Sequence, residues 1–371
     1  MTEQRLHGQP AAEADDSPPE IAVVAVDGGN SKTDVALVGA DGAVLGVARG
    51  PSTSHQAVGS RTAMRTLVAL VDAAASEGGR SGAARGATHA AVLVHCVAGA
   101  DLRSDDRLIE RWLRPLGLAD RTIVRNDAFA GLRAGAASGW GVSVVCGAGL
   151  NCVGIGPTGR TVRYPALGEI SGDWGGGLGV GTAALGAAVR ARDGRGQRTA
   201  LETLVPAWFA LSRPLALVEA IHLGRIGEAR LGELAPVVFD AAGEGDAVAR
   251  SIVDRVADEV VLIAVSAIRR LGVARRPVEV VLAGGLFRTD DSPFHDRVGR
   301  GIHAVAPWAV VHRLAAPPVL GAALLGLDAL GVTAAAEVRA RVELTVERLE
   351  RASSTDRLER AASADRPSEA R

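Results

Sequence analysis

The stretch that decides the fold is IAVVAVDGGNSKTDVALVGADGAVLGVA, residues 21–48. Its apolar run 21–26 is typical of a buried strand and ends in the glycine turn DGGN. Further strands are predicted over 34–39 and 43–48, and Asp41-Gly42 between them favours a tight hairpin. The stretch therefore predicts a three-stranded β-meander with polar residues at the end of its first strand.

The same pattern returns in GVSVVCGAGLNCVGIGPTGRTVRY, residues 141–164. Again an apolar strand runs into a glycine turn, returns as a second strand and turns tightly into a third. Two copies could arise by chance, because β-meanders are common, but an internal duplication is the interpretation we favour. It predicts two similar α/β lobes, each a mixed sheet flanked by helices.

The rest of the chain alternates between segments with the periodicity of helices and segments with that of strands. Helices are predicted over 57–76, 104–116, 178–192, 200–210, 231–243, 245–272, 292–305 and 319–330, and strands over 90–98, 122–126, 278–285 and 309–314. The predicted domains are a disordered tail (1–20), an N-terminal lobe (21–125), a C-terminal lobe (126–333) and a charged tail (334–371).

Composition narrows the function classes. The 371 residues suggest two domains at roughly 150 residues each. With 41 Lys and Arg against 42 Asp and Glu, the chain lacks the basic excess of a general nucleic-acid or membrane-surface binder. It has no apolar run long enough to span a bilayer, and its three cysteines fit reduced thiols, so we expect a cytoplasmic protein. Lys32 is the only lysine.

Glycine clusters follow four of the apolar strands or turns. Glycine there lets the backbone approach a phosphate and direct N–H groups towards it. One cluster alone is more simply a tight turn, but four in one chain favour nucleotide binding. The clusters are Gly28-Gly29, Gly147/Gly149, Gly175–Gly177 and Gly284-Gly285.

Two familiar phosphate motifs are excluded. The sequence around Lys32 is VDGGNSKT, which lacks the glycines that a P-loop requires. The dinucleotide fingerprint GxGxxG must lie between a strand and a helix, whereas the strand 21–26 is followed by another strand.

The segments VDGGNSKTDVAL, RNDAFAG, CGAGLNCVG, GDWGGG and VVLAGGLF occur in this order within roughly residues 21–330. They resemble the phosphate-1, connect-1, phosphate-2 and adenosine motifs of the actin/sugar-kinase ATPase superfamily. Within it, the chain is similar to the BadF/BadG/BcrA/BcrD ATPase family, which includes N-acetylglucosamine kinases. The resemblance implies two ribonuclease-H-like lobes with ATP and substrate in the cleft between them.

The resemblance implies that the first glycine turn binds Mg²⁺ and the phosphates of ATP. The carboxylate of Asp27 is suited to hold Mg²⁺ directly or through water, although it could simply cap the turn. Lys32 would place its charge on the β- and γ-phosphates, or it is an exposed hairpin lysine. The predicted contacts with the nucleotide in this turn are Gly28, Gly29, Asn30, Ser31, Lys32 and Thr33.

Asp127 matches the catalytic aspartate of the similar kinases. It begins a predicted helix after the strand 122–126. A carboxylate there can accept the proton of the sugar hydroxyl as the phosphoryl group transfers. Aspartate at a helix start is also a common N-cap, and one carboxylate could serve both purposes.

The sugar contacts are carried over from the same motifs. Asp173 lies where similar kinases read glycine-aspartate-glutamate-glycine, but here Trp174 replaces the glutamate, with Glu169 a possible substitute. Trp174 would stack on sugar or adenine, or fill the core. Ser54 stands where sugar kinases commonly carry asparagine, which leaves the identity of the sugar open, and His55 is a ligand contact or an exposed loop histidine. The predicted sugar contacts are Ser54, His55, Asn126, Asn151 and Asp173.

The second lobe supplies the remaining predicted nucleotide contacts. Gly321 is expected near the nucleotide or at a close helix contact, and the cysteines flanking the phosphate-2 turn are read as small buried residues. The full set is Gly147, Ala148, Gly149, Gly176, Gly284, Gly285 and Gly321.

The function implied is an ATP-dependent kinase acting on the 6-hydroxyl of N-acetylglucosamine or a related amino sugar. One alternative is an ATPase activator of a 2-hydroxyacyl-CoA/benzoyl-CoA-type reductase or dehydratase, but its iron–sulfur cluster needs cysteines at a dimer interface, where none is evident. Another is a sugar-binding regulator, which the short N-terminal tail disfavours because it has no room for a helix-turn-helix. A homodimer is a family expectation, and no nucleic-acid or membrane partner is expected.

Overall fold

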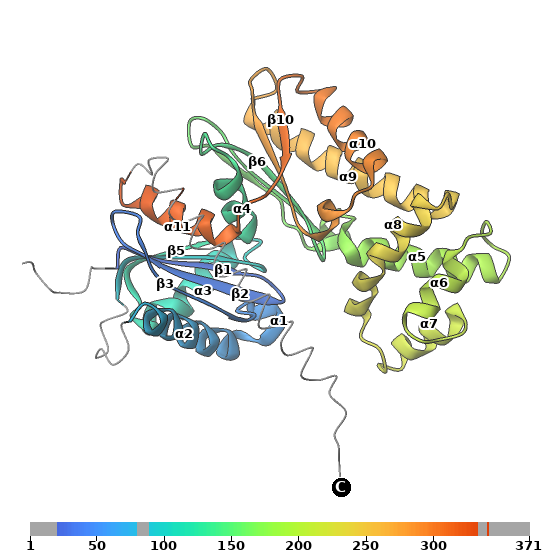
Figure 1. Cartoon of the computed structure of the whole chain (residues 1–371), viewed down its shortest axis with the longest axis horizontal. Coiled ribbons are helices and arrows are strands. Elements are labelled where there is room, and N and C mark those ends of the chain that lie inside the picture. Colours follow the sequence, from blue (N-terminus) through green and yellow to red (C-terminus); the bar gives the residue numbers. More distant parts are fainter. Residues whose placement is uncertain (1–20, 80–88, 333–339, 341–371) are drawn as a thin grey trace, which may run out of the picture.

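The computed structural model describes residues 21–79, 89–332 and 340. The two predicted tails therefore lie outside the described residues, apart from 340. Figure 1 shows two sheets, each with its own helices, joined through a pair of helices that lies between them. In the described part of the chain, no helix is long and apolar enough to cross a membrane.

The first sheet contains the first predicted meander. Its strands are β1 (Val23–Gly28), β2 (Lys32–Val38), β3 (Val44–Pro51), β4 (Ala90–Val97) and β5 (Ala119–Arg125), in the order β3-β2-β1-β4-β5. The meander β1–β2–β3 is antiparallel, whereas β4 and β5 are added in parallel. The mixed sheet predicted for this lobe is confirmed.

The second sheet repeats this topology. Its strands are β6 (Gly141–Cys146), β7 (Leu150–Ile155), β8 (Thr161–Arg163), β9 (Glu279–Ala283) and β10 (Val310–Arg313), in the order β10-β9-β6-β7-β8. Here too the meander is antiparallel and the two later strands are parallel. Reversed, the order is that of the first sheet, so the prediction of two similar α/β lobes is confirmed.

Strand β1 is covered on both faces, which explains its unbroken apolar sequence. Val23 and Ala25 pack into the cluster that contains the last helix, while Val24 and Val26 pack on the opposite side. Alternate side chains of a strand point to opposite faces, so a strand buried on both faces must be apolar at every position.

The helices of the first lobe are α1 (His55–Val58), α2 (Ser60–Glu77) and α3 (Arg103–Leu113), followed by the 3-10 turn η1 (Arg114–Leu116). Those of the second are α5 (Gly176–Arg192), α6 (Leu201–Trp208), α7 (Pro214–His222), α8 (Ala235–Gly243), α9 (Ala247–Leu271) and α10 (Ser292–His303), with 3-10 turns η2 (Gly168–Ser171), η3 (Glu228–Leu234) and η4 (Gly285–Arg288). Sequence analysis did not predict α7, a nine-residue helix in a segment without a long period.

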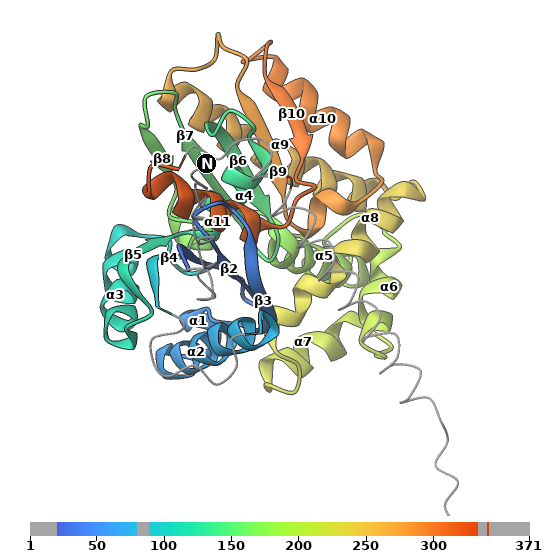
Figure 2. The same cartoon turned by 60° about the vertical axis from the view of Figure 1, so that its left-hand side comes forward.

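Two helices lie between the sheets: α4 (Asp127–Gly135) packs on β6 and β7, and α11 (Pro318–Ala329) packs on β1 and β4 and against α4. Figures 1 and 2 show α11 on the face of the first sheet opposite α2. The sequence grouped α11 with the second lobe, so its position corrects that grouping. Buried apolar side chains along α11 fit the first sheet, and the ion pair of Arg133 with Asp328 fixes it to α4.

Candidate functional site

The first glycine turn forms as predicted, directly after Asp27. The N–H of Gly29 donates to the carbonyl of Lys32 at 2.9 Å. A Cβ on Gly28 would lie 2.5 Å from Oγ1 of Thr53, so only glycine fits that position without a shift. Asn30, Ser31 and Lys32 are exposed at the tip of the turn.

Asp27 carries a carboxyl group with a strongly shifted pKa. Burial above all, and then the negative charges of Asp127 and Asp34, raise that pKa to about 8, against the opposing charges of Lys32 and Arg49. Asp34 stands directly opposite Asp27 in the β1–β2 ladder. Three carboxylates therefore approach one another where a cation would offset their repulsion.

Lys32 is paired with Asp34, its Nζ lying 3.0 Å from Oδ2. The guanidinium of Arg49 binds the same carboxylate with two nitrogens. No pattern in the sequence indicated a role for Asp34, which follows Lys32 by two residues, or for Arg49, which strand pairing places opposite Asp34. The predicted contact of Lys32 with phosphates stays a prediction.

Thr33 points into the interior, unlike the predicted phosphate contact. Its side chain is fully buried, and its Oγ1 lies 3.0 Å from Oγ1 of Thr53 and accepts the backbone N–H of Thr53. The alternation of β2 turns Thr33 inward, opposite to Lys32. Thr33 therefore ties β2 to the segment after β3 instead of facing a ligand.

Ser54 and His55 follow that segment and hold buried polar atoms without partners. Oγ of Ser54 and Nδ1 of His55 are buried and accept or donate no hydrogen bond among the described residues. The ring of His55 packs edge-on against Trp112, with centroids 5.4 Å apart. A buried polar atom is costly unless it is satisfied, so both atoms fit a ligand that completes their hydrogen bonds.

Asp127 is the first residue of α4, but Asn126 caps the helix. Oδ1 of Asn126 accepts the N–H of Ala128 at 2.9 Å. Burial raises the pKa of Asp127 to about 6, against the opposing effect of backbone N–H groups at Ala128 and at Asp127 itself. Such a carboxyl is ionised at neutral pH and still basic enough to accept a proton.

A chain of polar side chains joins the two lobes beside Asp127. Nδ2 of Asn126 donates to Oδ1 of Asp101, and Nδ2 of Asn151 donates to Oδ1 of Asn126, both at 2.9 Å. Arg163, at the end of β8, donates to Asp106 of α3 at 2.6 Å and to the carbonyl of Ala100. No pattern in the sequence indicated a role for Asp101 or Arg163.

The glycine turns of the second lobe line one cavity of about 1120 Å³. Gly147 and Ala148 come from the turn after β6, Gly177 from the start of α5 and Gly285 from the turn after β9. The sequence therefore identified three separate segments that the structure brings together. A cavity of this size can hold a nucleoside and part of its phosphate chain.

Close backbone approach explains two of the glycines beside this cavity. A Cβ on Gly176 would lie 2.4 Å from Cα of Gly149, and one on Gly284 would lie 2.4 Å from the carbonyl oxygen of Cys146. Both have positive φ angles, 67° and 104°, which L side chains rarely adopt. The turns pack against each other through these glycines.

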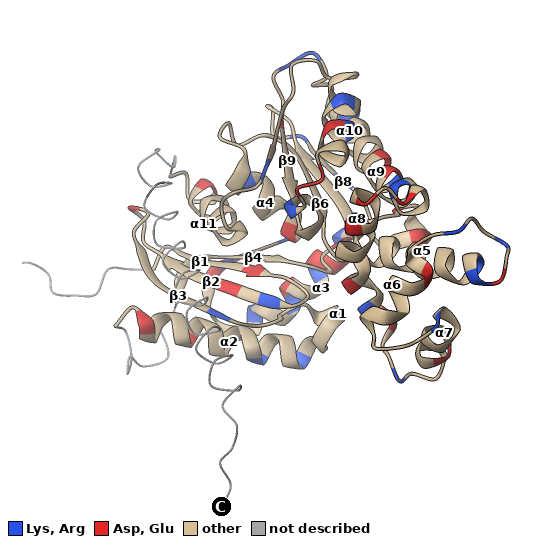
Figure 3. Cartoon of the chain, turned by 45° about the vertical axis from the view of Figure 1, so that its right-hand side comes forward, with Lys and Arg blue, Asp and Glu red and all other residues tan. Residues whose placement is uncertain are grey.

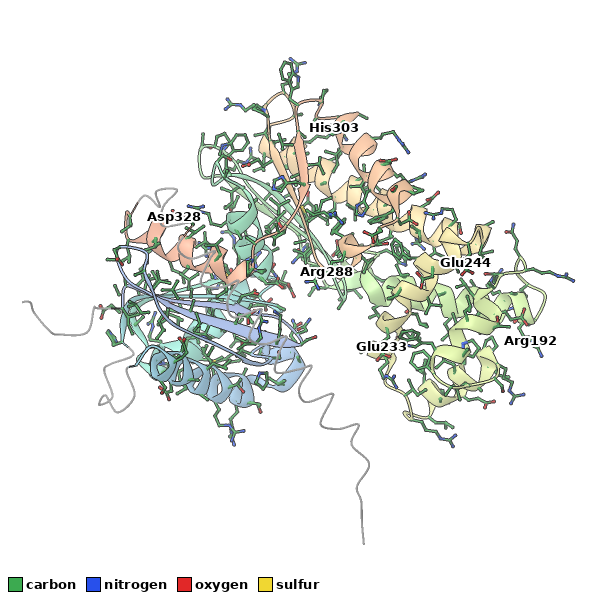
Figure 4. All side chains as sticks on the ribbon, viewed as in Figure 1. Arg192, Glu233, Glu244, Arg288, His303 and Asp328 are labelled. Atoms are coloured by element: carbon green, nitrogen blue, oxygen red, sulfur yellow. The ribbon has the colours of Figure 1, made fainter. Side chains whose placement is uncertain are left out.

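Charged side chains line the rest of the cavity. Arg288 of η4, Glu233 of η3 and Glu244 at the end of α8 are labelled in Figure 4. Glu233 is paired with Arg230, at 2.8 Å. No motif in the sequence indicated Arg288 or Glu233, because their common position depends on how η3 and η4 fold around the glycine turns.

Gly321 is not part of this cavity. A Cβ there would lie 1.8 Å from the carbonyl oxygen of Ala130, at the crossing of α4 and α11. Of the two alternatives predicted for Gly321, the close helix contact is the one observed.

Asp173 and Trp174 lie in the segment between η2 and α5. The carboxylate of Asp173 accepts a hydrogen bond from Oγ of Ser171 at 2.5 Å, while Glu169 is exposed. Trp174 packs against the second-lobe core, and the guanidinium of Arg255 lies 3.8 Å from its ring centroid. Trp174 is thus partly buried against the core and in contact with an arginine, and its stacking on a ligand stays a prediction.

The family's sequence model matches residues 24–326. The chain belongs to the BadF/BadG/BcrA/BcrD ATPase family. This membership covers both sheets and the glycine turns, and it confirms the resemblance on which the site residues were assigned.

Characterised relatives are kinases of amino sugars. The N-acetylmuramic acid/N-acetylglucosamine kinase of Clostridium acetobutylicum is 30% identical over 266 residues, which cover 71% of this chain and 85% of the relative. The N-acetyl-D-glucosamine kinase of Dictyostelium discoideum is 24% identical over 312 residues, covering 82% and 97%. A candidate N-acetylglucosamine kinase structure from Chromobacterium violaceum shares the fold, with a TM-score of 0.64 and 22% identity over 83% of this chain and all of the other.

Proposed function

We propose that this protein is an ATP-dependent sugar kinase whose acceptor is N-acetylglucosamine or a related amino sugar, phosphorylated at its 6-hydroxyl. The observation that carries the proposal is Asp127, a largely buried carboxylate of raised pKa at the start of α4. It lies beside amides from both lobes, in a fold that also gathers three glycine turns around one cavity. Family membership and the kinase activity named for both relatives support the same reaction.

In the reaction that we propose, Asp127 accepts the proton of the sugar hydroxyl. The hydroxyl oxygen forms a bond to the γ-phosphorus of ATP, while the bond from that phosphorus to the bridging oxygen breaks and ADP leaves. A carboxyl with a pKa near 6 is predominantly ionised at pH 7, so it is ready to act as the base.

Asp27 fits a magnesium ion. Its carboxyl offers hard oxygen donors. Burial and the charges of Asp127 and Asp34 raise its pKa to about 8, and a divalent cation bound there would stabilise the ionised form. When bound, Mg²⁺ supplies positive charge to the phosphates of the nucleotide. Lys32 and Arg49 already balance Asp34 through their ion pairs, which leaves Asp27 as the candidate ligand.

The nucleotide and the sugar are assigned to different groups of residues. We place the nucleoside in the cavity of the second lobe and the phosphates between its glycine turns and the turn after β1. The unsatisfied atoms of Ser54 and His55, the amides of Asn126 and Asn151, and Asp173 form the proposed acceptor side. ATP as the donor and three buried thiols favour the cytoplasm as the working compartment. The homodimer stays a prediction.

An ADP-release assay over a panel of sugars and amino sugars tests the proposal. We expect ATP turnover to be stimulated most strongly by N-acetylglucosamine or a closely related amino sugar, and the phosphate to be found on its 6-hydroxyl. Asp120→Asn, at an exposed carboxylate of β5, serves as a control for aspartate substitution away from the site. If no sugar raises ATP turnover above background, the chain is not a sugar kinase.

The alternative of an electron-transfer activator is disfavoured by the cysteines. Cys96, Cys146 and Cys152 are all free and buried. Burial raises the pKa of each thiol, that of Cys146 to about 12. A cluster between subunits needs accessible cysteines that ligate as thiolates. A visible spectrum and an iron assay on anaerobically purified protein would reveal such a cluster.

A further inference from the structure

The chain has three asparagines in 371 residues: Asn30, Asn126 and Asn151. Asn30 is exposed in the first glycine turn, whereas Asn126 and Asn151 bond to each other where the lobes meet. Asp101, in the loop after β4, stands at the end of this chain of amides and was assigned no function from the sequence.

Hydrogen bonding fixes the orientation of both amides. Oδ1 of Asn126 accepts from the N–H of Ala128 and from Nδ2 of Asn151. Because two donors hold that oxygen, Nδ2 of Asn126 must face an acceptor, and Oδ1 of Asp101 is that acceptor at 2.9 Å. Oδ1 of Asn151 accepts the N–H of Cys152 at 2.7 Å, so its Nδ2 faces Asn126.

Asp101 is itself held in place from both lobes. Only 8% of the residue is exposed, and its carboxylate also accepts a hydrogen bond from the side chain of Gln56. Oδ2 of Asp105 accepts its backbone N–H at 3.2 Å. Arg163 of the second lobe binds the carbonyl of the preceding Ala100, so the loop cannot turn without breaking a contact between the lobes.

We infer that Asp101 is a positioning residue for the acceptor sugar: it sets the orientation of Asn126, and through Asn126 that of Asn151. This inference rests on the proposed function, in which the two amides contact the sugar. The second N–H of Asn151 is directed only as long as Oδ1 of Asn126 accepts the first. Without an acceptor at position 101, Nδ2 of Asn126 is left buried and unpaired, which loosens the amide whose oxygen accepts from Asn151.

Kinetics of substitutions at Asp101 provide the first test. Asp101→Ala removes the acceptor, and we expect the KM for N-acetylglucosamine to rise about tenfold or more while the KM for ATP changes less than about twofold. Asp101→Asn keeps an oxygen that can accept from Asn126, so its effect is expected to be clearly smaller. Equal losses in the two variants, or an unchanged sugar KM in Asp101→Ala, would overturn the inference.

Exchanging the side chains of residues 101 and 126 gives a sharper version of this test. Asn126→Asp alone sets two carboxylates against each other and is expected to raise the sugar KM strongly. In the double variant Asp101→Asn/Asn126→Asp, the carboxylate introduced at position 126 can accept from Ala128, from Asn151 and from the amide introduced at position 101. We therefore expect the sugar KM to recover by about tenfold relative to Asn126→Asp. No recovery would mean that residue 101 does not act through residue 126.

An NMR measurement decides whether Asp101 orients the two amides even if no sugar is phosphorylated. Labelling with ¹⁵N-asparagine gives side-chain amide signals from only the three asparagines of the chain. In Asp101→Ala we expect the signals of Asn126 and Asn151 to shift and to exchange faster with water, while that of Asn30 is unchanged. If the chemical shift and exchange rate of the Asn151 amide are unchanged, Asp101 does not orient Asn151 through Asn126. Failure of the sugar panel alone would instead refute only the kinase proposal.

Discussion

The two sheets have the same strand order, but their equivalent strand ends carry different chemistry. At the end of its first strand and in the turn that follows, the meander of the first lobe reads VDGGN and that of the second reads CGAGLN. The two strands end differently: Asp27, near the end of β1, has the carboxylates of Asp34 and Asp127 beside it, whereas Cys146, the last residue of β6, is a thiol buried in the core of the second lobe. A duplicated scaffold supplies two similar turns, and side-chain substitution at their edges gives each a separate task.

The surroundings of the two turns also differ, charged around the first and formed by close backbone packing around the second. The first lies among Asp27, Asp34, Lys32 and Arg49, while the second is packed against other glycine turns around the cavity. Figure 3 shows acidic and basic residues interspersed over the helices of both lobes. The two turns are therefore distinguished by local charge at the first and by close backbone packing at the second. They are not distinguished by the overall charge of their lobes.

The largest effect is expected on turnover, when the proposed catalytic carboxylate of Asp127 is removed without changing the fold. Asp127→Asn removes the base but keeps the size of the side chain, so we expect turnover to fall by about 10²- to 10⁴-fold. Nucleotide affinity, measured by isothermal titration, is expected to stay within a few-fold, with Asp120→Asn as the matched control. A parallel loss of nucleotide binding would mean that Asp127 maintains the structure instead.

Substitutions at the two strand ends test the comparison directly. Asp27→Asn is expected to lower turnover by about 10- to 100-fold and to raise the Mg²⁺ concentration for half-maximal activity, because a neutral amide is a weaker ligand for a hard cation. Cys146→Ser is expected to leave the Mg²⁺ dependence unchanged, since no charge is lost. The same Mg²⁺ shift in both variants would contradict a division of tasks between the turns.

Glycine packing in the second lobe gives an effect on stability. Gly284→Ala forces a Cβ against the carbonyl of Cys146 at a positive φ, and we expect it to destabilise the protein by about 2 kcal/mol or more and to weaken ATP binding. Gly186→Ala, within α5 where a Cβ meets open space, should be neutral or slightly stabilising. Thermal unfolding with and without ATP compares the two. Equal melting temperatures would show that Gly284 is not required for packing.

The smallest expected effect is a pH dependence of stability at Asp127. Its pKa is about 6 when folded against 3.8 for the reference group, so the folded protein holds this proton more tightly than the unfolded chain does. That stabilisation is complete below pH 4 and is lost as the pH rises through 6. Asp127→Asn has no such loss, so without Mg²⁺ or nucleotide it should gain up to about 3 kcal/mol relative to wild type between pH 4 and pH 7.

Denaturant unfolding of both proteins at several pH values measures this gain. Asp72→Asn, at an exposed residue of α2, serves as the control here, because Asp120 pairs with His89, raises its pKa and would itself alter the pH dependence. A difference between Asp127→Asn and wild type that does not change with pH would contradict the raised pKa.

The local elements of the fold could be predicted because their signals lie in adjacent residues. The apolar runs of β1, β4 and β6 marked strands, and Asp41-Gly42 marked a hairpin, which forms with the N–H of Gly39 bonded to the carbonyl of Ala43. The short helix α7 was missed because nine residues do not carry a clear period. The resemblance, not periodicity, pointed to Asp127.

The contacts of the site were harder to predict, since they join distant residues. Thr33 turned inward, Lys32 found Asp34, and Gly321 met Ala130 across a helix crossing. Asp101 could have been noticed as a carboxylate after the strand 90–98, the same signal that marked Asp27. Arg163 and Arg288 carried no signal in the sequence at all.

The sequence by itself determined the repeated meander, the glycine turns and the family, because strand period and glycine spacing are properties of neighbouring residues. Only the tertiary structure decided where α11 packs, which turns share a cavity, and which amides meet across the lobes. It also decided the basicity of Asp127, since that depends on how much water the surrounding chain removes. Burial and contact arise between segments far apart in the chain, and a local pattern does not encode them.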